Sequence, residues 1–475
     1  MKRLAFATLF AALSACSFAP EYKRPETVAP PQYRFAQPGE ASSIADVPWW
    51  QVFRDPVLQD LIRAALASNQ DLALAAARVE EARALVGIAK ADFYPQIDAQ
   101  VSAAYGRPIS KAVDPNADWG GRFTALGTVS WELDLWGRIR NSRDAAIADL
   151  LATDDGRRAV LLSLVSGVAQ AYLELRELDL ELDIAKSNTE TRRGTLNLFL
   201  ARSRQGVASD LEVNQARSDL AVTTAAMPET ELRVAVKEHQ LCVLLGRAPG
   251  AIPRGLLLSD STLPPDIPLG VPAQLLERRP DVVAAEQGVI AAGHRVGIAV
   301  ANRLPTLSLT GFIGLETPSL SKLGSDALAG SVGAGLFAPL FQGGRLAAAE
   351  EASRAVLDQA IASYRKSVQQ ALQEVADAAV SIQKTREART AHADQVTAIS
   401  IAARLALKRY EGGVSSYFEV LDAQRQLFDA QLGLARSQRD ELTSVVLLYR
   451  ALGGGWQQQE ETQHNGTPLP PPPPR

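Results

Sequence analysis

Hydrophobic and polar positions alternate in four short stretches of the chain. Every second residue is apolar over 97–105 and, with a glycine interruption, over 123–133, and the pattern returns over 307–315 and in a glycine-rich form over 332–338. A period of two over about ten residues is typical of a barrel strand with one apolar and one polar face. A soluble sheet packed on one face would give the same pattern in any single stretch, so both alternatives stay open at this point.

A helical period follows each pair of strands. The chain has no proline from 116 to 227 or from 340 to 467, and within the second stretch apolar residues recur every three or four positions. This stripe comprises Leu357, Ile361, Tyr364, Val368, Leu372, Val375, Ala379 and Ile382. A helix from Arg345 to about Glu411 would be roughly 100 Å long, which is longer than a globular core requires.

Glycines then end the long helix and turn the chain back. Gly412–Ser416 breaks the pattern, with serine as the N-cap of a returning helix that ends at Gly453–Gly455. Shorter helical stretches, about 56–93 and 273–303, precede the strand pairs, and each ends just before a proline, which disfavours helix in the residue before it. Each half of the chain is therefore expected to hold a helix, two strands and a long antiparallel helical hairpin.

The two halves share short sequences in the same order and at nearly the same separation. The matched segments are Ala89–Pro95 with Ala299–Pro305, Gly206–Ser209 with Gly413–Ser416, and Leu245-Gly246 with Leu452-Gly453. This agreement predicts a tandem duplication. The first repeat would span 56–250 and the second 273–456, with 251–272, rich in proline and glycine, as the linker.

The two ends of the chain differ from the repeats. Met1-Lys2-Arg3, the apolar run Leu4–Leu13 and the small Ser14-Ala15 predict a signal peptide over 1–15 that is absent from the working protein. Residues 16–55 would form an amino-terminal arm, and the proline-rich 457–475 a disordered tail. No later stretch offers about 20 consecutive apolar residues, so a transmembrane helix is not expected and any crossing of a bilayer must use strands.

The signal peptide ends in a motif with a chemical consequence. Leu13-Ser14-Ala15-Cys16 resembles the bacterial lipobox, which implies cleavage before Cys16, a diacylglycerol on its thiol and palmitate on its new amine. Two or more acyl chains anchor a protein durably. Ser17, rather than Asp, follows the cysteine, and in bacterial lipoproteins this implies sorting to the outer membrane. The alternative is an ordinary signal peptide with a coincidental cysteine.

Composition and charge exclude several classes of function. The 475 residues are 47% hydrophobic, 21% charged and 6% aromatic, as in a folded, helix-rich chain. The 49 basic and 53 acidic residues give a net charge of −4 with no basic block, so nucleic acid is not an expected partner. Two cysteines and four scattered histidines predict neither a disulfide framework nor a metal cluster. No catalytic triad or phosphate-binding loop is present, so we expect neither an enzyme nor a cofactor.

Four strands of membrane length cannot close a barrel by themselves. An open sheet edge facing lipid would leave backbone groups without hydrogen bonds, so the chain must oligomerise if the strands span a membrane. Two chains would give about eight strands and a filled barrel, whereas three would give an open one.

The motifs along the chain carry a resemblance to a known family. They are Leu13–Cys16, Phe18–Pro25, Trp49–Leu58, Leu276–Val282, Phe341–Arg345, Leu421–Arg425 and Ala451–Trp456. With these segments the sequence resembles the bacterial outer-membrane efflux factors of the TolC type, most closely the NodT/OprM lipoprotein branch, over nearly the whole mature chain.

The resemblance implies a mainly α protein with a transmembrane β-barrel, in which a homotrimer forms a twelve-stranded barrel in the outer membrane and a twelve-helix tunnel across the periplasm. It also implies docking onto a periplasmic adaptor and an inner-membrane pump of the RND type, and a passive exit duct for drugs or other small toxic compounds. The alternatives are a periplasmic adaptor-like structural lipoprotein, or the outer-membrane duct of a heavy-metal or type I secretion system.

Two sets of residues are expected to work at the periplasmic end of such a trimer. The hairpin turns are expected to contact the adaptor through Gly206, Val207, Ser209, Gly413, Val414 and Ser416. Phe418, Asp422 and Arg425 share one helix face just after the second turn, and family members close at this level with an apolar and an acidic ring. The resemblance therefore implies a periplasmic gate at these three residues, with an ordinary surface ion pair as the alternative.

Overall fold

The computed structural model describes residues 17–27, 43–44, 54–107, 119–260, 275–318 and 327–454. The expected signal peptide, the expected lipid site at Cys16 and the expected tail over 457–475 lie outside the described residues, as does part of the expected linker.

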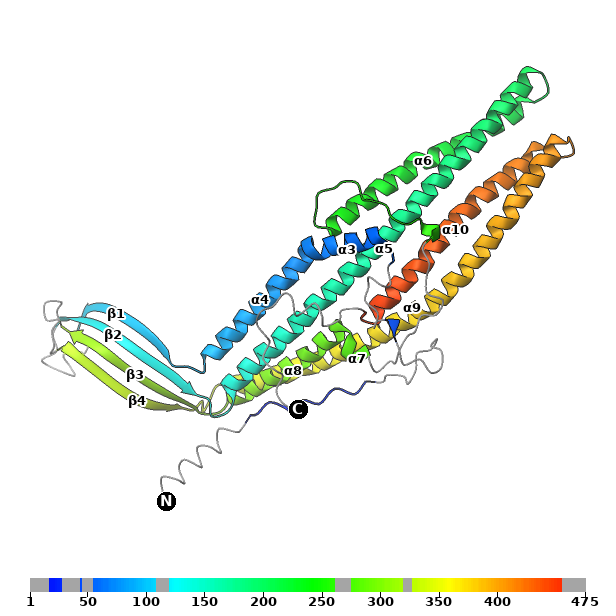
Figure 1. Cartoon of the computed structure of the whole chain (residues 1–475). Coiled ribbons are helices and arrows are strands. Elements are labelled where there is room, and N and C mark those ends of the chain that lie inside the picture. The colour runs from blue at the N-terminus through cyan, green and yellow to red at the C-terminus, as the bar shows by residue number, and fades with distance from the viewer. Residues whose placement is uncertain are drawn as a thin grey trace. The chain divides into compact units, whose positions relative to one another are not determined.

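The same order of elements occurs twice (Figure 1). The first repeat contains α3 (Pro56–Ser68), α4 (Gln70–Ala91), β1 (Gln96–Gly106), β2 (Gly120–Leu133), α5 (Arg138–Arg204) and α6 (Asp210–Leu244). After the short 3-10 helix η2 (Leu258–Asp260), the second contains α7 (Leu275–Arg278), α8 (Pro280–Ala301), β3 (Thr306–Thr317), β4 (Leu328–Phe337), α9 (Arg345–Glu411) and α10 (Tyr417–Ala451). Helices α5 and α9 have 67 residues each, and α6 and α10 have 35 each. The expected duplicated arrangement of helices and strands is confirmed.

The shorter helical stretches differ from expectation, because each contains a break. In the first repeat Asn69 separates α3 from α4, and its side-chain Oδ1 accepts a hydrogen bond from the Leu72 backbone N–H at 3.0 Å, as an N-cap does. In the second repeat Arg279 separates α7 from α8, because the proline that follows it disfavours helix in the preceding residue.

At both breaks, a side chain caps the carboxyl end of another helix. The Asn69 amide donates to the Leu244 carbonyl at the end of α6 at 2.9 Å, and Arg279 donates to the Ala451 carbonyl at the end of α10 at 3.0 Å. These bonds satisfy carbonyl groups that a helix end leaves free. Just beyond each contact, Gly246 and Gly453 adopt φ of 65° and 73°, and each lies against the backbone preceding the break.

The described residues form two compact units that cut across the repeats. Unit 1 takes its residues from 1–26, 77–155 and 284–366, and contains all four strands. Unit 2 takes its residues from 27–76, 156–283 and 367–475. It contains α6, α10 and the parts of α5 and α9 that follow residues 155 and 366. Each repeat thus contributes a strand pair to unit 1 and a hairpin to unit 2.

The strands of unit 1 form one antiparallel sheet in the order β1-β2-β3-β4 (Figure 1). The pairing of β2 with β3, from Phe123 opposite Thr317 to Leu133 opposite Leu307, joins the two repeats. A small cluster of Val79, Val86 and Leu150 packs α4 against α5 in the same unit.

The expected apolar stripe of α9 is buried at five of its eight positions, and Leu357, Ile361 and Leu372 are half-buried. Within unit 1 Tyr364 is buried, and within unit 2 Val368, Val375 and Ile382 are buried. In unit 2 the carboxylate of Asp55 caps α3, accepting from the Val57 N–H at 2.8 Å, and also accepts from the Tyr172 hydroxyl at 3.0 Å and the Leu256 N–H at 3.0 Å. This one carboxylate therefore joins the start of the first repeat to the chain that follows α6.

Among the described residues, α5 is the one helix with an 18-residue window apolar enough to cross a membrane by length and composition. Of that window 44% is buried inside the protein. A core helix of a soluble protein passes the same test, so this window is weak evidence for a membrane-spanning helix.

Candidate functional site

The strand register sorts the side chains of the sheet onto two faces. Directly paired residues share a face, and Val101, Ala125, Leu315 and Leu328 form one row across all four strands. This face is apolar except for Thr317, which lies opposite Phe123 at the end of β3. Its other residues are Ile97, Ala99, Val101, Ala103 and Tyr105 on β1, Gly121, Phe123, Ala125, Gly127, Val129, Trp131 and Leu133 on β2, Leu307, Leu309, Gly311, Ile313 and Leu315 on β3, and Leu328, Gly330, Val332, Ala334 and Leu336 on β4.

The opposite face is largely polar. It carries Asp98, Gln100, Ser102, Thr124, Thr128, Ser130, Glu132, Thr306, Ser308, Thr310, Glu316 and Ser331, with Leu126, Phe312 and Phe337 as large apolar exceptions. The Ser102 and Thr124 hydroxyls are hydrogen-bonded at 2.6 Å, and Arg122 pairs with Glu316 at 2.9 Å. Such a face suits contact with water.

Within the described residues, no layer of side chains covers the apolar face. Val101 is 82% exposed and Val332 is 91% exposed. A soluble sheet would bury such a face against a second layer, so the alternative of an ordinary packed sheet does not fit. A polar face behind an exposed apolar face is the arrangement of a barrel wall between lipid and an aqueous lumen.

Aromatic side chains mark both ends of the sheet. At the loop end Tyr105 stacks on Trp119 with ring centroids 6.2 Å apart, and the Arg107 guanidinium lies 5.5 Å from the Trp119 centroid. At the helix end the Trp131 indole donates to the Phe93 carbonyl at 3.0 Å. Aromatic girdles at both interfaces are typical of strands that span an outer membrane.

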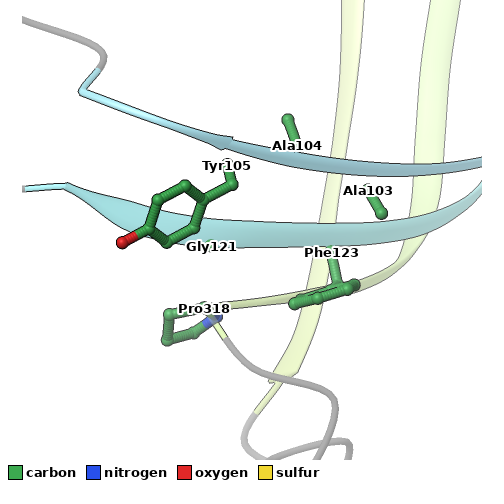
Figure 2. A pocket seen from close by; sticks show the side chains of 6 residues that line it. All are labelled: Ala103, Ala104, Tyr105, Gly121, Phe123 and Pro318. Carbon is green, nitrogen blue, oxygen red and sulfur yellow. The ribbon is translucent and has the colours of Figure 1, made fainter.

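A shallow cavity of about 400 Å³ lies at the loop end of the sheet. Figure 2 shows the residues that line it: Ala103, Ala104, Tyr105, Gly121, Phe123 and Pro318. A side chain at Gly121 would meet the Pro318 carbonyl at 2.7 Å. The lining holds no charged group, so the cavity has no catalytic or metal-binding constellation.

The two hairpin turns in unit 2 have the same geometry. Gly206 and Gly413 both adopt φ of 73°, and the residues after them, Val207 and Val414, donate to the Arg202 and Arg409 carbonyls at 2.9 and 3.1 Å. Ser209 makes a capping box with Glu212, whereas Ser416 occupies the N-cap of α10 without a side-chain hydrogen bond. Val207 is 73% exposed and Val414 is 70% exposed, so each turn presents an apolar side chain to the surroundings.

An aromatic cluster joins the hairpins just below the turns. The ring centroid of Phe199, on α5, lies 4.2 Å from that of Tyr417 and 5.7 Å from that of Tyr410. The Tyr410 hydroxyl donates to the Glu212 carboxylate at 3.3 Å. The turns of unit 2 therefore stand on a shared apolar core and hold a defined position relative to each other.

The three expected gate residues lie on α10, close to this cluster. Arg425 pairs with Asp422 at 2.8 Å, and Asp422 also accepts from the Gln426 amide at 2.6 Å. Phe418 is 66% exposed. The structure thus brings Asp422 and Arg425 together and leaves the phenylalanine one turn away unpacked.

Sequence reasoning missed a buried ion pair near the gate residues. Arg192 of α5 pairs with Asp219 of α6 at 3.0 Å, and its guanidinium lies 5.5 Å from the Phe428 ring centroid of α10. Burial lowers the pKa of Arg192 and raises that of Asp219. Sequence reasoning also missed Glu181, which is buried between Arg233 at 2.6 Å and Arg436 at 2.9 Å. Neither acid stands out in sequence from the many exposed charges on these helices.

These features define a class of protein, a channel whose wall in the membrane is made of strands and whose extension is made of helical hairpins. The model of the family described as "Outer membrane efflux protein" matches residues 61–247 and 271–454. The chain therefore belongs to the outer membrane efflux protein family.

Individual relatives support the same assignment. The chain is 34% identical over 454 residues to the toluene efflux pump outer membrane protein TtgC of Pseudomonas putida, with 93% of each chain covered. It has the same identity and coverage with the antibiotic efflux pump outer membrane protein ArpC of Pseudomonas putida. The solved outer-membrane channel OprN superposes with a TM-score of 0.85 at 32% identity, covering 93% of this chain and all of that one.

The protein is an efflux channel of the outer membrane that extends into the periplasm, and it is not an enzyme. As such a channel, it is one component of an efflux pump. The alternative of a periplasmic adaptor is set aside.

Proposed function

We propose that the chain is the trimeric exit duct of a tripartite RND-type pump that exports drugs or other small toxic compounds. The observation that carries the trimer is the four-stranded sheet of unit 1, whose outer strands β1 and β4 each have one partner strand among the described residues. Its exposed apolar face is suited to contact with lipid. In lipid, the unpaired backbone groups of an open sheet edge would be energetically unfavourable. Three copies would close a twelve-stranded barrel with an aqueous lumen, whereas two would close a filled one.

The two hairpins of each chain support a helical tunnel in addition to that barrel. Two hairpins per chain give four long helices, and three chains would bring twelve together. The equivalent turns at Gly206–Ser209 and Gly413–Ser416 would then form a ring of six tips, each with an exposed valine, which suits contact with a periplasmic adaptor.

Two further assignments complete the proposal. Cys16 would carry the diacylglycerol and the palmitate that anchor the chain, and Phe418, Asp422 and Arg425 would narrow the periplasmic end. The substrate class rests on relatives named for toluene and antibiotic efflux.

The trimer and the duct can be tested together. Protein purified from outer membranes should give the mass of three chains in native mass spectrometry, and deletion of its gene should sensitise cells to toluene and antibiotics but not to metal ions. A two-chain mass would overturn the trimer. Sensitivity confined to metal ions would overturn the substrate class in favour of a heavy-metal duct.

A further inference from the structure

The first described residues of the chain are docked onto unit 1. The Ser17 hydroxyl donates to Asn141 Oδ1 of α5 at 3.3 Å. The ring centroids of Phe18 and Trp136 lie 6.4 Å apart. Both contacts join residues more than a hundred positions apart and lie within one compact unit. The segment is therefore held by the folded protein, although it has no regular secondary structure.

Glu286 of α8 is the main attachment point. This buried carboxylate accepts from the Tyr22 hydroxyl at 2.5 Å and from Arg24 Nε and Nη2 at 2.9 and 2.8 Å. The hydrogen bond to Glu286 raises the pKa of Arg24, and burial together with the same carboxylate raises the pKa of Tyr22. A bidentate arginine–carboxylate contact is among the strongest polar contacts in proteins, and removal of its cation would leave a buried charge unpaired.

The backbone between these contacts fits a gap on α8. Gly297 has no side chain, and a Cβ there would lie 2.9 Å from the Ala19 nitrogen and 2.7 Å from the Asn141 amide. Asn141 Oδ1 also lies 3.0 Å from His294 Nδ1, which fixes the amide that receives Ser17. The backbone of the arm can therefore lie against α8 at this point only because residue 297 is glycine.

The docked end of the arm lies where the strands meet the helices. Trp136 stands between the last residue of β2 and the first of α5, and its indole donates to the Pro305 carbonyl at 2.6 Å, directly before β3. Ser17 therefore leaves the protein at the helix end of the sheet, and Cys16 is covalently one residue away, within about 3.8 Å between Cα atoms.

We propose that Trp136, Asn141, Glu286 and Gly297 form an arm clamp, which holds residues 17–24 and so fixes the point at which the lipid on Cys16 enters the membrane. The inference rests on the proposed lipidation of Cys16. With a free arm the lipid could occupy a wide area around the protein, whereas the clamp holds it at the helix end of the sheet. Anchor and strands then enter the bilayer at one level as parts of one rigid structure.

The clamp can be measured by the distance between two spin labels in unit 1, at Glu21→Cys on the exposed part of the arm and Asn302→Cys after α8. Cys242 is buried and the thiol of Cys16 would carry diacylglycerol, so labelling of the lipidated protein is confined to the introduced cysteines. We expect one narrow distance distribution in the parent, and a several-fold wider one after Tyr22→Phe with Arg24→Ala. Both changes lie on the arm, so no residue of the helices and strands of unit 1 is replaced. Lys23→Ala is the matched control, because Lys23 is exposed and its ion pair with Glu21, at 3.9 Å, is already absent from the labelled protein.

Lipid and clamp are separated by repeating the measurement with Cys16→Ala. The clamp predicts that the narrow distribution persists in this unlipidated protein. A broad distribution there, or an unchanged one after loss of Tyr22 and Arg24 contacts, overturns the proposal. Radioactive palmitate should label the parent and not Cys16→Ala. If the parent takes up no palmitate, the lipid assignment is wrong, and the distances in Cys16→Ala still report independently on whether the arm is clamped.

Position in the membrane is the final readout. A label at Pro20→Cys in proteoliposomes should lie at headgroup depth in the lipidated parent, and its depth distribution should broaden when the arm contacts are removed. Equal depth distributions in the two proteins would show that the clamp does not position the anchor.

Discussion

Asp422 and Arg425 show how a weak contact can matter at the scale of single residues. An exposed i,i+3 ion pair stabilises a helix by only about 0.2–0.5 kcal/mol, and this pair sits beside the unpacked ring of Phe418. Its consequence for the fold of one chain is therefore small. In the proposed trimer it would recur three times around the axis, where it would narrow the passage.

Replacing Asp422 with alanine should open the periplasmic end without unfolding the protein. We expect a several-fold higher single-channel conductance in planar bilayers and an almost unchanged melting temperature. Gln215→Ala, at the equivalent position of the first repeat, is the matched control and should conduct like the parent. Equal conductance of the parent and Asp422→Ala would mean that the gate lies elsewhere.

Arg279 is a residue on which stability depends. It is buried, pairs with Asp281 and Glu374 at 2.6 Å each, and donates to the Ala451 carbonyl. Arg279→Ala should lower the free energy of unfolding by about 3 kcal/mol, because it removes the charged hydrogen bond of a buried guanidinium to Ala451 together with two ion pairs to half-exposed carboxylates. Asn69→Ala removes two neutral hydrogen bonds, the equivalent contact with Leu244 and the cap of α4, and should cost about 2 kcal/mol. Denaturant titration in detergent measures both, and equal losses would contradict this ranking.

His294 should make stability depend on pH. Burial lowers its pKa below the ordinary 6.5, with Asp144 opposing and Arg143 reinforcing that shift. The unfolded chain therefore binds a proton that the folded chain resists, and stability is lost as pH falls below about 6.5. We expect the drop in melting temperature between pH 7.5 and 5.5 to shrink in His294→Gln. An identical drop in parent and variant would rule out this histidine as its source.

At the scale of elements, the hairpins combine rigidity with exposed ends. The aromatic cluster of Phe199, Tyr410 and Tyr417 fixes the turns, while Val207 and Val414 remain uncovered. Exposed apolar groups held on a rigid support are well suited to bind a partner, since little conformational entropy is lost on binding.

Charges at the two turns should disrupt that contact. Val207→Asp with Val414→Asp should weaken the affinity for the adaptor by about a hundredfold if each buried valine contributes roughly 1.5 kcal/mol. Crosslinking to the adaptor and drug resistance should fall with it. The fold should be unaffected, because both side chains are exposed. Val222→Asp, which places the same charge at an exposed position farther along α6, is the control. Unchanged crosslinking and resistance in the double variant would eliminate the contact.

At the scale of the whole molecule, the sheet determines where the protein resides. Val101 and Gln100 are neighbours on β1 that lie on opposite faces. Lysine at a lipid-facing position near the middle of a strand costs about 2–4 kcal/mol, whereas lysine toward water costs little.

Val101→Lys should therefore reduce insertion into the outer membrane, and Gln100→Lys should not. Heat-modifiable migration on gels and the amount of protein in outer-membrane fractions measure this difference. If both variants insert equally well, the assignment of the apolar face to lipid is wrong.

Much of this architecture follows from the sequence alone, because it depends on local physics. A period of two sets the faces of each strand, a period near 3.6 without proline sets the bounds of α9 at Arg345 and Glu411, and glycines that must adopt positive φ set the turns at Gly206 and Gly413. The duplication is likewise visible in residues whose spacing repeats.

Other features were decided only by the tertiary structure, because they depend on residues far apart in the chain. The break at Asn69 has a use only when the end of α6 lies beside it, and Arg279 is anchored by Glu374 and Ala451. The arm clamp joins Arg24 to Glu286 across 262 positions. A single carboxylate on an apolar helix carries no local pattern that names its partner, so such contacts exist only in the folded chain.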